Sequence, residues 1–227
     1  MHKYLRAIGF SCIKNRREYE NLITFDFICR GVNSPKAYRA WLNELEEKSK
    51  KQIKRVWFKY KDGGWKTSPR RTRIDFTDGS FVVQEQDKNL FMTGYLGSNL
   101  YIRPSCGNCD FKGTPRLSDI TLADFWGIDK ELDDDKGTSL LLVNSPAGQR
   151  IFERARENLV VHQRSFQEIF GGNACMESSV NINPKSRDFL VSLDKEIFSR
   201  AIKNYTRQSL GKQILTKGKR ILKRVLR

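Results

Sequence analysis

Apolar residues along the chain fall into short alternating or unbroken runs, and these runs predict β-strands. Residues 22–31 form an apolar, β-branched and aromatic run that Gly31 closes, which predicts a buried strand whose end delivers Cys29 to a loop. The pair Asp78-Gly79 stands between two alternating segments and predicts a tight β-hairpin. Further strands are expected at residues 55–61, 119–127, 139–144 and 159–162. The central residues of 139–144 are all apolar, so we expect a fully buried strand in a sheet covered on both faces.

Apolar residues at helical spacing follow three pairs that end in proline, and each pair predicts the start of a helix. The pair Ser34-Pro35 supplies an N-cap and a first helical residue, and the pair Ser145-Pro146 repeats this pattern for a helix to about residue 158. The pair Asn183-Pro184 opens a longer helix, which carries apolar residues on one face through residue 202. Together the elements predict an α+β fold in which helices flank a mixed sheet.

The C-terminal residues differ in composition from the rest of the chain. From Arg207 to Arg227 there are eight basic residues and no acidic one, with apolar residues at helical spacing and a break at Gly218. We therefore expect one domain over residues 1–205 and a basic amphipathic helix over residues 206–227. This tail could lie on an anionic membrane surface, or it could pack its apolar stripe on its own domain.

The overall charge favours anionic partners. Lys and Arg outnumber Asp and Glu by 42 to 26, a net charge of +16, which suits nucleic acid, phosphorylated cofactors or lipid headgroups. No run approaches the roughly 18 apolar residues of a spanning helix, and the N-terminus lacks the apolar core of a signal peptide. We expect a cytoplasmic protein whose tail offers a contact to the inner face of the membrane.

Cys106 and Cys109 form a Cys-x-x-Cys knuckle, whose two intervening residues let both sulfur atoms turn to one side. Zinc and iron–sulfur clusters both use such a pair, and each needs about four ligands. Cys29 is the candidate third ligand because it follows a strand, and loops at strand ends commonly carry sites. The remaining cysteines are Cys12 and Cys175.

The cysteine count and the histidines bear on the kind of site. The only histidines, His2 and His162, do not lie at ligand spacing from a cysteine, which favours iron–sulfur over zinc. An odd number of cysteines without a secretory segment argues against a structural disulfide. No serine or cysteine motif lies near His162, so we expect a structural role for it rather than a place in a hydrolytic triad.

Acidic residues near the knuckle can be interpreted as part of a functional site or as loop caps. Asp119 and Asp124 flank an apolar strand at a spacing of five, which places them on opposite faces and argues against a paired acid–base couple. Their alternative role is to cap loops. The loop from Asp133 to Ser139 carries carboxylates, a lysine and hydroxyls, and it could bind a phosphate, a magnesium ion or no ligand.

Aromatic and basic residues interleave between Trp57 and Arg73, with Trp65 among them. This composition is found in platforms for single-stranded nucleic acid, and it is equally that of an exposed hairpin. No known nucleic-acid motif supports the first reading, so a basic nucleic-acid or polyanion binding module is kept as the alternative function.

Four segments carry a resemblance to a known family: Tyr19–Lys36, Arg103–Gly113, Arg116–Ile128 and Asp135–Asn144. In this order they resemble the C-terminal domain of the coenzyme F420 hydrogenase/dehydrogenase beta-subunit family, over about residues 15 to 205. The likeness is to the bacterial branch that is often encoded near polysaccharide-biosynthesis genes.

The resemblance implies a flavin-dependent oxidoreductase module with an iron–sulfur cluster, which exchanges electrons with a redox partner or a ferredoxin-like protein. It implies that Cys29, Cys106 and Cys109 are ligands of a [4Fe-4S] cluster. It also implies a flavin, FAD, near two loops, with candidate binding residues Arg116, Asp119, Asp124, Lys136, Gly137, Thr138 and Ser139.

The chain departs from the family pattern at two places. The family carries a further cysteine in a Gly-Thr-Pro-Cys-Gln motif upstream of the segment that corresponds to residues 3–8, and this chain begins too late to include it. We therefore expect an N-terminally truncated module that binds flavin weakly and is inactive alone, with Cys12 or another chain supplying the fourth ligand. Arg30 stands where the family often has histidine, which would change the charge beside the cluster.

Overall fold

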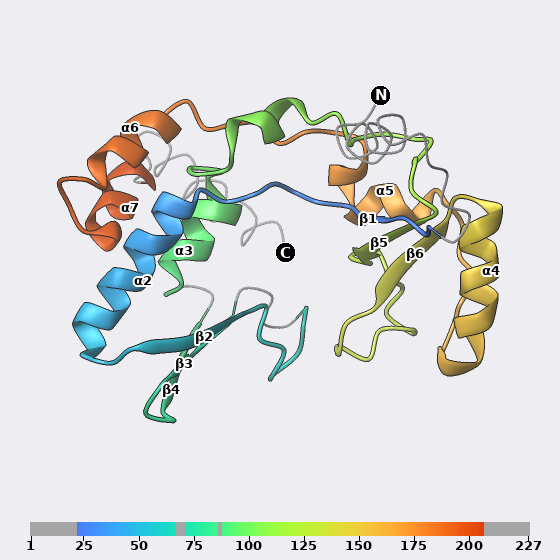
Figure 1. Ribbon diagram of the computed structural model, residues 1–227, viewed down its shortest axis with the longest axis horizontal. Helices are drawn as coiled ribbons and strands as arrows, with labels where there is room; N and C mark the ends of the chain where they lie inside the picture. The colour runs from blue at the N-terminus through green and yellow to red at the C-terminus, as the bar shows by residue number, and fades with distance from the viewer. Residues whose placement is uncertain (1–21, 67–70, 86–87, 207–227) are drawn as a thin grey trace, which may run out of the picture.

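The computed structural model describes residues 22–66, 71–85 and 88–206. Within them the α+β prediction is confirmed, since helices flank two small three-stranded sheets (Figure 1). The predicted amphipathic tail and Cys12 lie outside the described residues, so the division at residue 205 stays a prediction. None of the helices in the described ranges is long and apolar enough to cross a membrane.

The first sheet is mixed and has the order β1-β5-β6. Its strands are β1 (Phe25–Phe27), β5 (Ile120–Asp124) and β6 (Ser139–Val143). Strand β1 runs parallel to β5, and β6 runs antiparallel to it with Asp124 opposite Ser139. The three strands come from segments far apart in the sequence, so this sheet forms only when the chain folds back on itself.

The second sheet is antiparallel and local in sequence. Its strands are β2 (Ile53–Phe58), β3 (Thr72–Phe76) and β4 (Phe81–Gln84), paired in that order. The predicted hairpin at Asp78-Gly79 is confirmed: Gly79 has a positive φ of 85°, and the Asp78 carboxylate accepts a hydrogen bond from the Ser80 amide at 2.9 Å.

Two of the three predicted helices begin at their prolines, and the third, α6, begins at Ser186, two residues after Pro184. Helix α2 starts at Pro35 and helix α4 at Pro146, and the Ser145 hydroxyl caps α4 by accepting from the Gly148 amide at 3.1 Å. The α-helices are α2 (Pro35–Ser49), α3 (Leu90–Met92), α4 (Pro146–Ala155), α5 (Glu168–Gly172), α6 (Ser186–Ser192) and α7 (Phe198–Thr206). A π-helical turn, Thr93–Gly97, continues α3, and short 3₁₀ segments lie at Pro104–Asn108, Arg156–Asn158 and Ala174–Met176.

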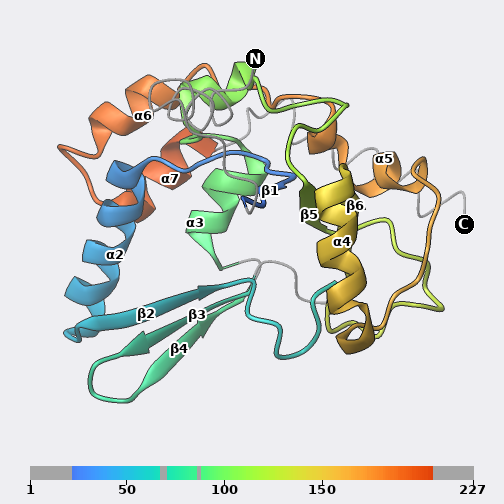
Figure 2. The same cartoon turned by 45° about the vertical axis from the view of Figure 1, so that its right-hand side comes forward.

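Two hydrophobic clusters divide the molecule into lobes (Figures 1 and 2). The helical lobe contains α2, α3, α6, α7 and the β2-β3-β4 sheet, and its core includes Trp41, Phe91 and Tyr101. The mixed-sheet lobe contains β1, β5, β6, α4 and α5, and its core includes Phe125 and Ile169. Three segments, at about residues 28–34, 100–117 and 173–185, run between the lobes in both views.

The mixed sheet is less covered than the sequence predicted. Strand β1 lies at its edge, and Phe25 and Phe27 are 56% and 67% exposed. In β6 only Leu140 is buried. The prediction of fully buried strands was wrong because β1 and β6 are both edge strands of a sheet with three strands, and β1 has only three residues.

Two predicted elements differ in the structure. Residues 159–162 form no strand, since neither sheet pairs with them and Val160 is 92% exposed. High β-propensity alone does not make a strand without a partner to pair with. The long helix expected through residue 202 is broken into α6 and α7, and α7 receives its own capping group from helix α2, as described below.

Candidate functional site

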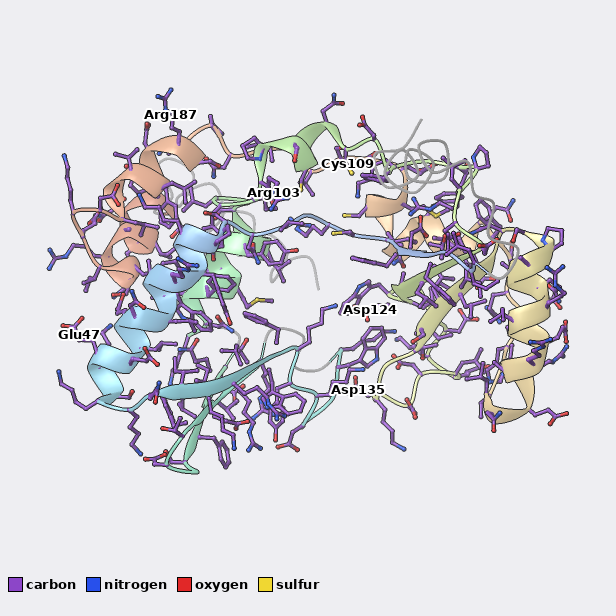
Figure 3. All side chains as sticks on the ribbon, viewed as in Figure 1. Glu47, Arg103, Cys109, Asp124, Asp135 and Arg187 are labelled. Carbon is purple, nitrogen blue, oxygen red and sulfur yellow. The ribbon has the colours of Figure 1, made fainter. Side chains whose placement is uncertain are left out.

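The cysteine knuckle lies on one of the three segments that join the lobes. Pro104 opens a 3₁₀ turn that contains Cys106, and Cys109 follows in extended conformation. Figure 3 shows the labelled Cys109 on this connecting segment, away from the outer helices of both lobes. Both thiols are free and half-buried.

The segment after β1 packs directly against this knuckle. The Val32 amide points to the Cys106 Sγ atom at 3.4 Å. A Cβ atom on Gly31 would lie 2.7 Å from the Ile102 Cγ2 atom and 3.4 Å from the Cys106 Cβ atom. Glycine at this position therefore lets the chain that carries Cys29 approach the chain that carries Cys106.

A third segment, residues 175–182, also packs against the knuckle. The Cys109 amide donates to the Ser179 hydroxyl at 2.9 Å, and the Gly113 amide donates to the Met176 carbonyl at 2.7 Å. A Cβ atom on Gly107 would lie 2.5 Å from the Ile182 Cγ1 atom. The knuckle thus contacts both the segment that carries Cys29 and the segment that carries Cys175.

The Lys112 ammonium group ties these two segments together. It donates to the backbone carbonyls of both Cys29 and Cys175, the second at 2.6 Å. The positive charge is therefore fixed beside the cysteines by the backbone on either side of it, and it is placed to stabilise thiolates.

The electrostatics of Cys29 reflect this neighbourhood. Burial raises the pKa of the Cys29 thiol, and the nearby Cys106 and Cys109 thiols raise it further, against the opposing effects of the Gly31 amide and Lys112. Burial and the neighbouring thiols also raise the pKa of Tyr95 to about 12, and the Tyr95 hydroxyl donates to the Gly31 carbonyl at 2.8 Å. The site therefore combines thiols with a phenol that stays protonated at neutral pH.

The structure brings the three predicted cysteine ligands into one neighbourhood, and it adds two residues that the sequence reasoning missed. Cys175 has no motif around it, and Lys112 is one of many lysines, so neither carried a signal in the sequence. Among the described residues no group of three or more histidine, cysteine or carboxylate side chains has the arrangement that would hold a single metal ion.

Two of the predicted flavin-binding residues, Arg116 and Asp119, bind several groups of the mixed-sheet lobe. The Arg116 guanidinium pairs with the Asp26 carboxylate and donates to the Phe111 carbonyl at 2.7 Å, and its side chain is almost fully buried. The Asp119 carboxylate accepts from the Thr24 amide and hydroxyl, both at 2.7 Å, and from the Ser145 hydroxyl. Burial alone would raise the pKa of Asp119, but these hydrogen bonds lower it overall. Both residues act as connections inside the mixed-sheet lobe.

The other predicted flavin residues lie at the opposite end of β5. Asp124 pairs with Lys59, and the Thr138 carbonyl accepts from the Phe125 amide at 2.8 Å. The Lys136 side chain is 85% exposed, and Ser139 is exposed at the start of β6. Because a strand rises about 3.3 Å per residue, Asp119 and Asp124 are separated by the length of β5, about 16 Å. The residues that flank β5 therefore form two groups.

The loop from Asp133 to Ser139 contacts the segment that follows β2. The Asp133 carboxylate accepts from the Trp65 indole at 3.1 Å and pairs with the Lys66 ammonium at 2.7 Å, and these contacts lower its pKa. The Asp135 carboxylate accepts from the Lys66 amide at 2.7 Å. Figure 3 shows the labelled Asp135 where this segment meets the mixed-sheet lobe. The carboxylates of this loop thus bind protein groups.

Of the two tryptophans in the aromatic and basic segment between Trp57 and Arg73, only Trp57 is exposed. Trp65 is buried and stacks on Trp126 with ring centroids 4.5 Å apart, so it is not available to a nucleic-acid base. Trp57 is exposed, with the Arg55 guanidinium 4.6 Å above its ring. His162 is exposed on the segment after α4. The geometry therefore favours the cysteine neighbourhood as the functional site.

Comparison with known proteins gives one match. The family model for the C terminus of the coenzyme F420 hydrogenase/dehydrogenase beta subunit matches residues 2–168. This match contains Cys29, Cys106 and Cys109, and it ends before Cys175. No curated protein and no solved structure matches the chain.

Proposed function

Because the chain belongs to the family defined by the C terminus of the coenzyme F420 hydrogenase/dehydrogenase beta subunit, we propose that it is an iron–sulfur, flavin-linked oxidoreductase module. One observation carries the proposal: the segment that follows Cys29 packs on the distant Cys106–Cys109 knuckle, through Gly31 and Val32, and both lie on segments that run between the two lobes. A fold that brings free thiols together in this way supplies the ligand type that iron–sulfur clusters require.

The chemistry of the residues fits such a cluster. When bound, it would take up and release single electrons. Cys29 carries a raised pKa, so binding must remove its proton, and the fixed Lys112 charge favours the thiolate that results. The Tyr95 hydroxyl and the Val32 amide orient the backbone and sulfur atoms around the site. These outer contacts influence the potential of a cluster through charge and hydrogen bonding.

We place the flavin at the end of β5 that carries Asp124 and the loop 136–139. Support comes from the Lys136 ammonium, which is exposed and has Asp134 at the long distance of 3.8 Å, and from the net charge of +16, both of which suit a pyrophosphate group. Arg116 and Asp119 then contribute by holding β1, β5 and α4 together rather than by contacting the flavin. Electrons would pass between this module and a redox partner, which we propose as a ferredoxin-like protein.

Anaerobic reconstitution with ferrous iron and sulfide tests the proposal. The wild-type chain should take up about four iron and four sulfide ions, whereas a Cys106→Ser, Cys109→Ser double variant should take up less than half as much. The variant His162→Ala serves as the control, because His162 is an exposed potential ligand outside the site, and it should match wild type. Equal and low iron uptake by wild type and the double variant would refute the proposal.

A further inference from the structure

The proposed cluster needs a fourth ligand. A four-iron cluster is bound by about four cysteine thiolates, and Cys29, Cys106 and Cys109 supply three. The described residues contain one more free cysteine, Cys175, which is half-buried. It lies outside the residues that the family model matches, so the family pattern does not assign it a role.

Backbone contacts bring Cys175 to the same place as Cys29. The Lys112 ammonium donates to the carbonyls of both residues. Since each such bond is about 3 Å long, two acceptors of one nitrogen lie within about 6 Å of each other. The backbones of these two cysteines are therefore neighbours, although Lys112 follows Cys29 by 83 residues and precedes Cys175 by 63.

Further contacts fix the segment of Cys175 against the knuckle. The Cys109 amide donates to the Ser179 hydroxyl at 2.9 Å, and Gly107 leaves the space that Ile182 occupies. Cys175 is thus held beside both the knuckle and Cys29 by independent interactions.

We propose that Cys175 is the fourth cysteine ligand, so that a complete set of four thiolates comes from this single chain. The inference rests on the proposed function, since it names a ligand of the same cluster. Each of the four thiols gives up its proton when it binds iron. Lys112 is then a positioning residue that holds two of the ligands, Cys29 and Cys175, next to each other and beside the knuckle.

The test compares Cys175→Ala with Cys12→Ala after anaerobic reconstitution. Alanine is chosen because a serine oxygen could replace the thiolate. Wild type and the Cys12 variant should both take up about four irons, and the Cys175 variant should take up about three or fewer, with the electron paramagnetic resonance signal of a three-iron cluster. Circular dichroism of the iron-free chains checks that each variant is folded.

Protection of wild-type cysteines provides a second measurement that needs no variant. The reconstituted chain is treated with iodoacetamide and analysed by mass spectrometry. Cys175 should be protected together with Cys29, Cys106 and Cys109, whereas Cys12 should be alkylated, and all five should react once the iron is removed.

The possible results separate the two proposals. If the Cys175 variant keeps about four irons, or if Cys175 is alkylated in the loaded chain, the fourth-ligand inference is overturned while the cluster itself stands. Loss of iron in the Cys12 variant alone would overturn it in favour of Cys12. If wild type takes up no iron, the proposed function fails and this inference fails with it.

Discussion

The Lys112 side chain binds two backbone segments that are distant from each other in the sequence. It is half-buried, and its ammonium group satisfies the carbonyls of Cys29 and Cys175. A lysine that binds carbonyls in this way acts as a structural clamp, and its charge also remains available to nearby thiolates.

The variant Lys112→Met tests the clamp, because methionine keeps the apolar length of the side chain and removes the donor. We expect the free energy of unfolding to fall by about 1–3 kcal/mol, since two carbonyls lose a charged hydrogen-bond partner. Urea denaturation of the iron-free chain measures this loss. The control Lys136→Met changes an exposed lysine and should stay within about 0.5 kcal/mol of wild type. A loss no larger than that of the control would show that Lys112 does not clamp the segments.

At the level of single residues, the sequence predicted those parts of the site that carry a local signal. The Cys106 and Cys109 knuckle was recognisable from its spacing, and Cys29 from its place after an apolar run. Lys112 and Cys175 were not recognisable, because their importance comes from contacts with residues 83 and 63 positions apart in the chain. Nothing in the neighbouring sequence encodes such a contact.

Helix α7 begins at a carboxylate that another helix supplies. Glu44 on α2 is buried, and its Oε2 atom accepts from the Ser199 amide at 2.6 Å in the first turn of α7. Its other oxygen pairs with Lys48. A negative charge at a helix N-terminus satisfies free amides and the helix dipole, so this contact joins α2 to α7.

The variant Glu44→Gln removes the charge and keeps the shape. Burial alone would raise the pKa of Glu44, but the hydrogen bonds from Lys48 and Ser199 outweigh it, so the folded-state pKa is lowered. The carboxylate therefore stabilises the fold above its unfolded pKa of about 4.3, and this contribution is lost as the pH falls through the lower folded value. We expect the variant to be about 1–3 kcal/mol less stable than wild type at pH 7.

Denaturation curves measured across the acidic range check this prediction. The difference between wild type and Glu44→Gln should shrink as the pH falls below the unfolded pKa of about 4.3 and disappear once the pH passes the lower folded value. Glu47→Gln, on the exposed part of the same helix, is the matched control and should change stability little (Figure 3). A stability difference that is the same at pH 7 and at low pH would contradict the role of the charge.

The elements also show which predictions local sequence supports. The hairpin at Asp78-Gly79 and the helix starts at Pro35 and Pro146 were predicted correctly, since turn residues and prolines act on their own backbone. The break between α6 and α7 was not predicted. Its capping group comes from Glu44, which is 155 residues away in the chain. Helical periodicity continues across the break and hides it.

The two lobes meet a second time through the segment 59–66, apart from the three connecting segments. This segment leaves β2 in the helical lobe and places Trp65 in the core of the mixed-sheet lobe. There the Trp65 amide donates to the Asp135 carbonyl at 2.9 Å, and Lys59 pairs with Asp124. The segment therefore couples the folding of one lobe to that of the other.

The variant Trp65→Ala tests this coupling. Removing a buried tryptophan that stacks on Trp126 should cost about 3–5 kcal/mol of unfolding free energy. Hydrogen exchange should accelerate in α2 as well as in β5 and β6, because the segment that carries Trp65 joins the two lobes. Trp57→Ala removes an exposed tryptophan and is the control. Equal stability losses for the two variants, or acceleration confined to β5 and β6, would contradict the proposed coupling.

The cysteines lie on three connecting segments that are far apart in the sequence, so they leave the ribosome one after another. Cys29 emerges first, the knuckle and Lys112 follow, and Cys175 emerges 63 residues after Lys112. At about 5–20 residues per second, the interval between the first and last of these cysteines is about 7–30 s. The nascent chain therefore carries thiols without their full set of partners throughout this period. If the proposed four-cysteine set binds the cluster, iron loading is a late step in biogenesis. Until Cys175 has been synthesised, oxidants can react with the earlier thiols before iron binds them.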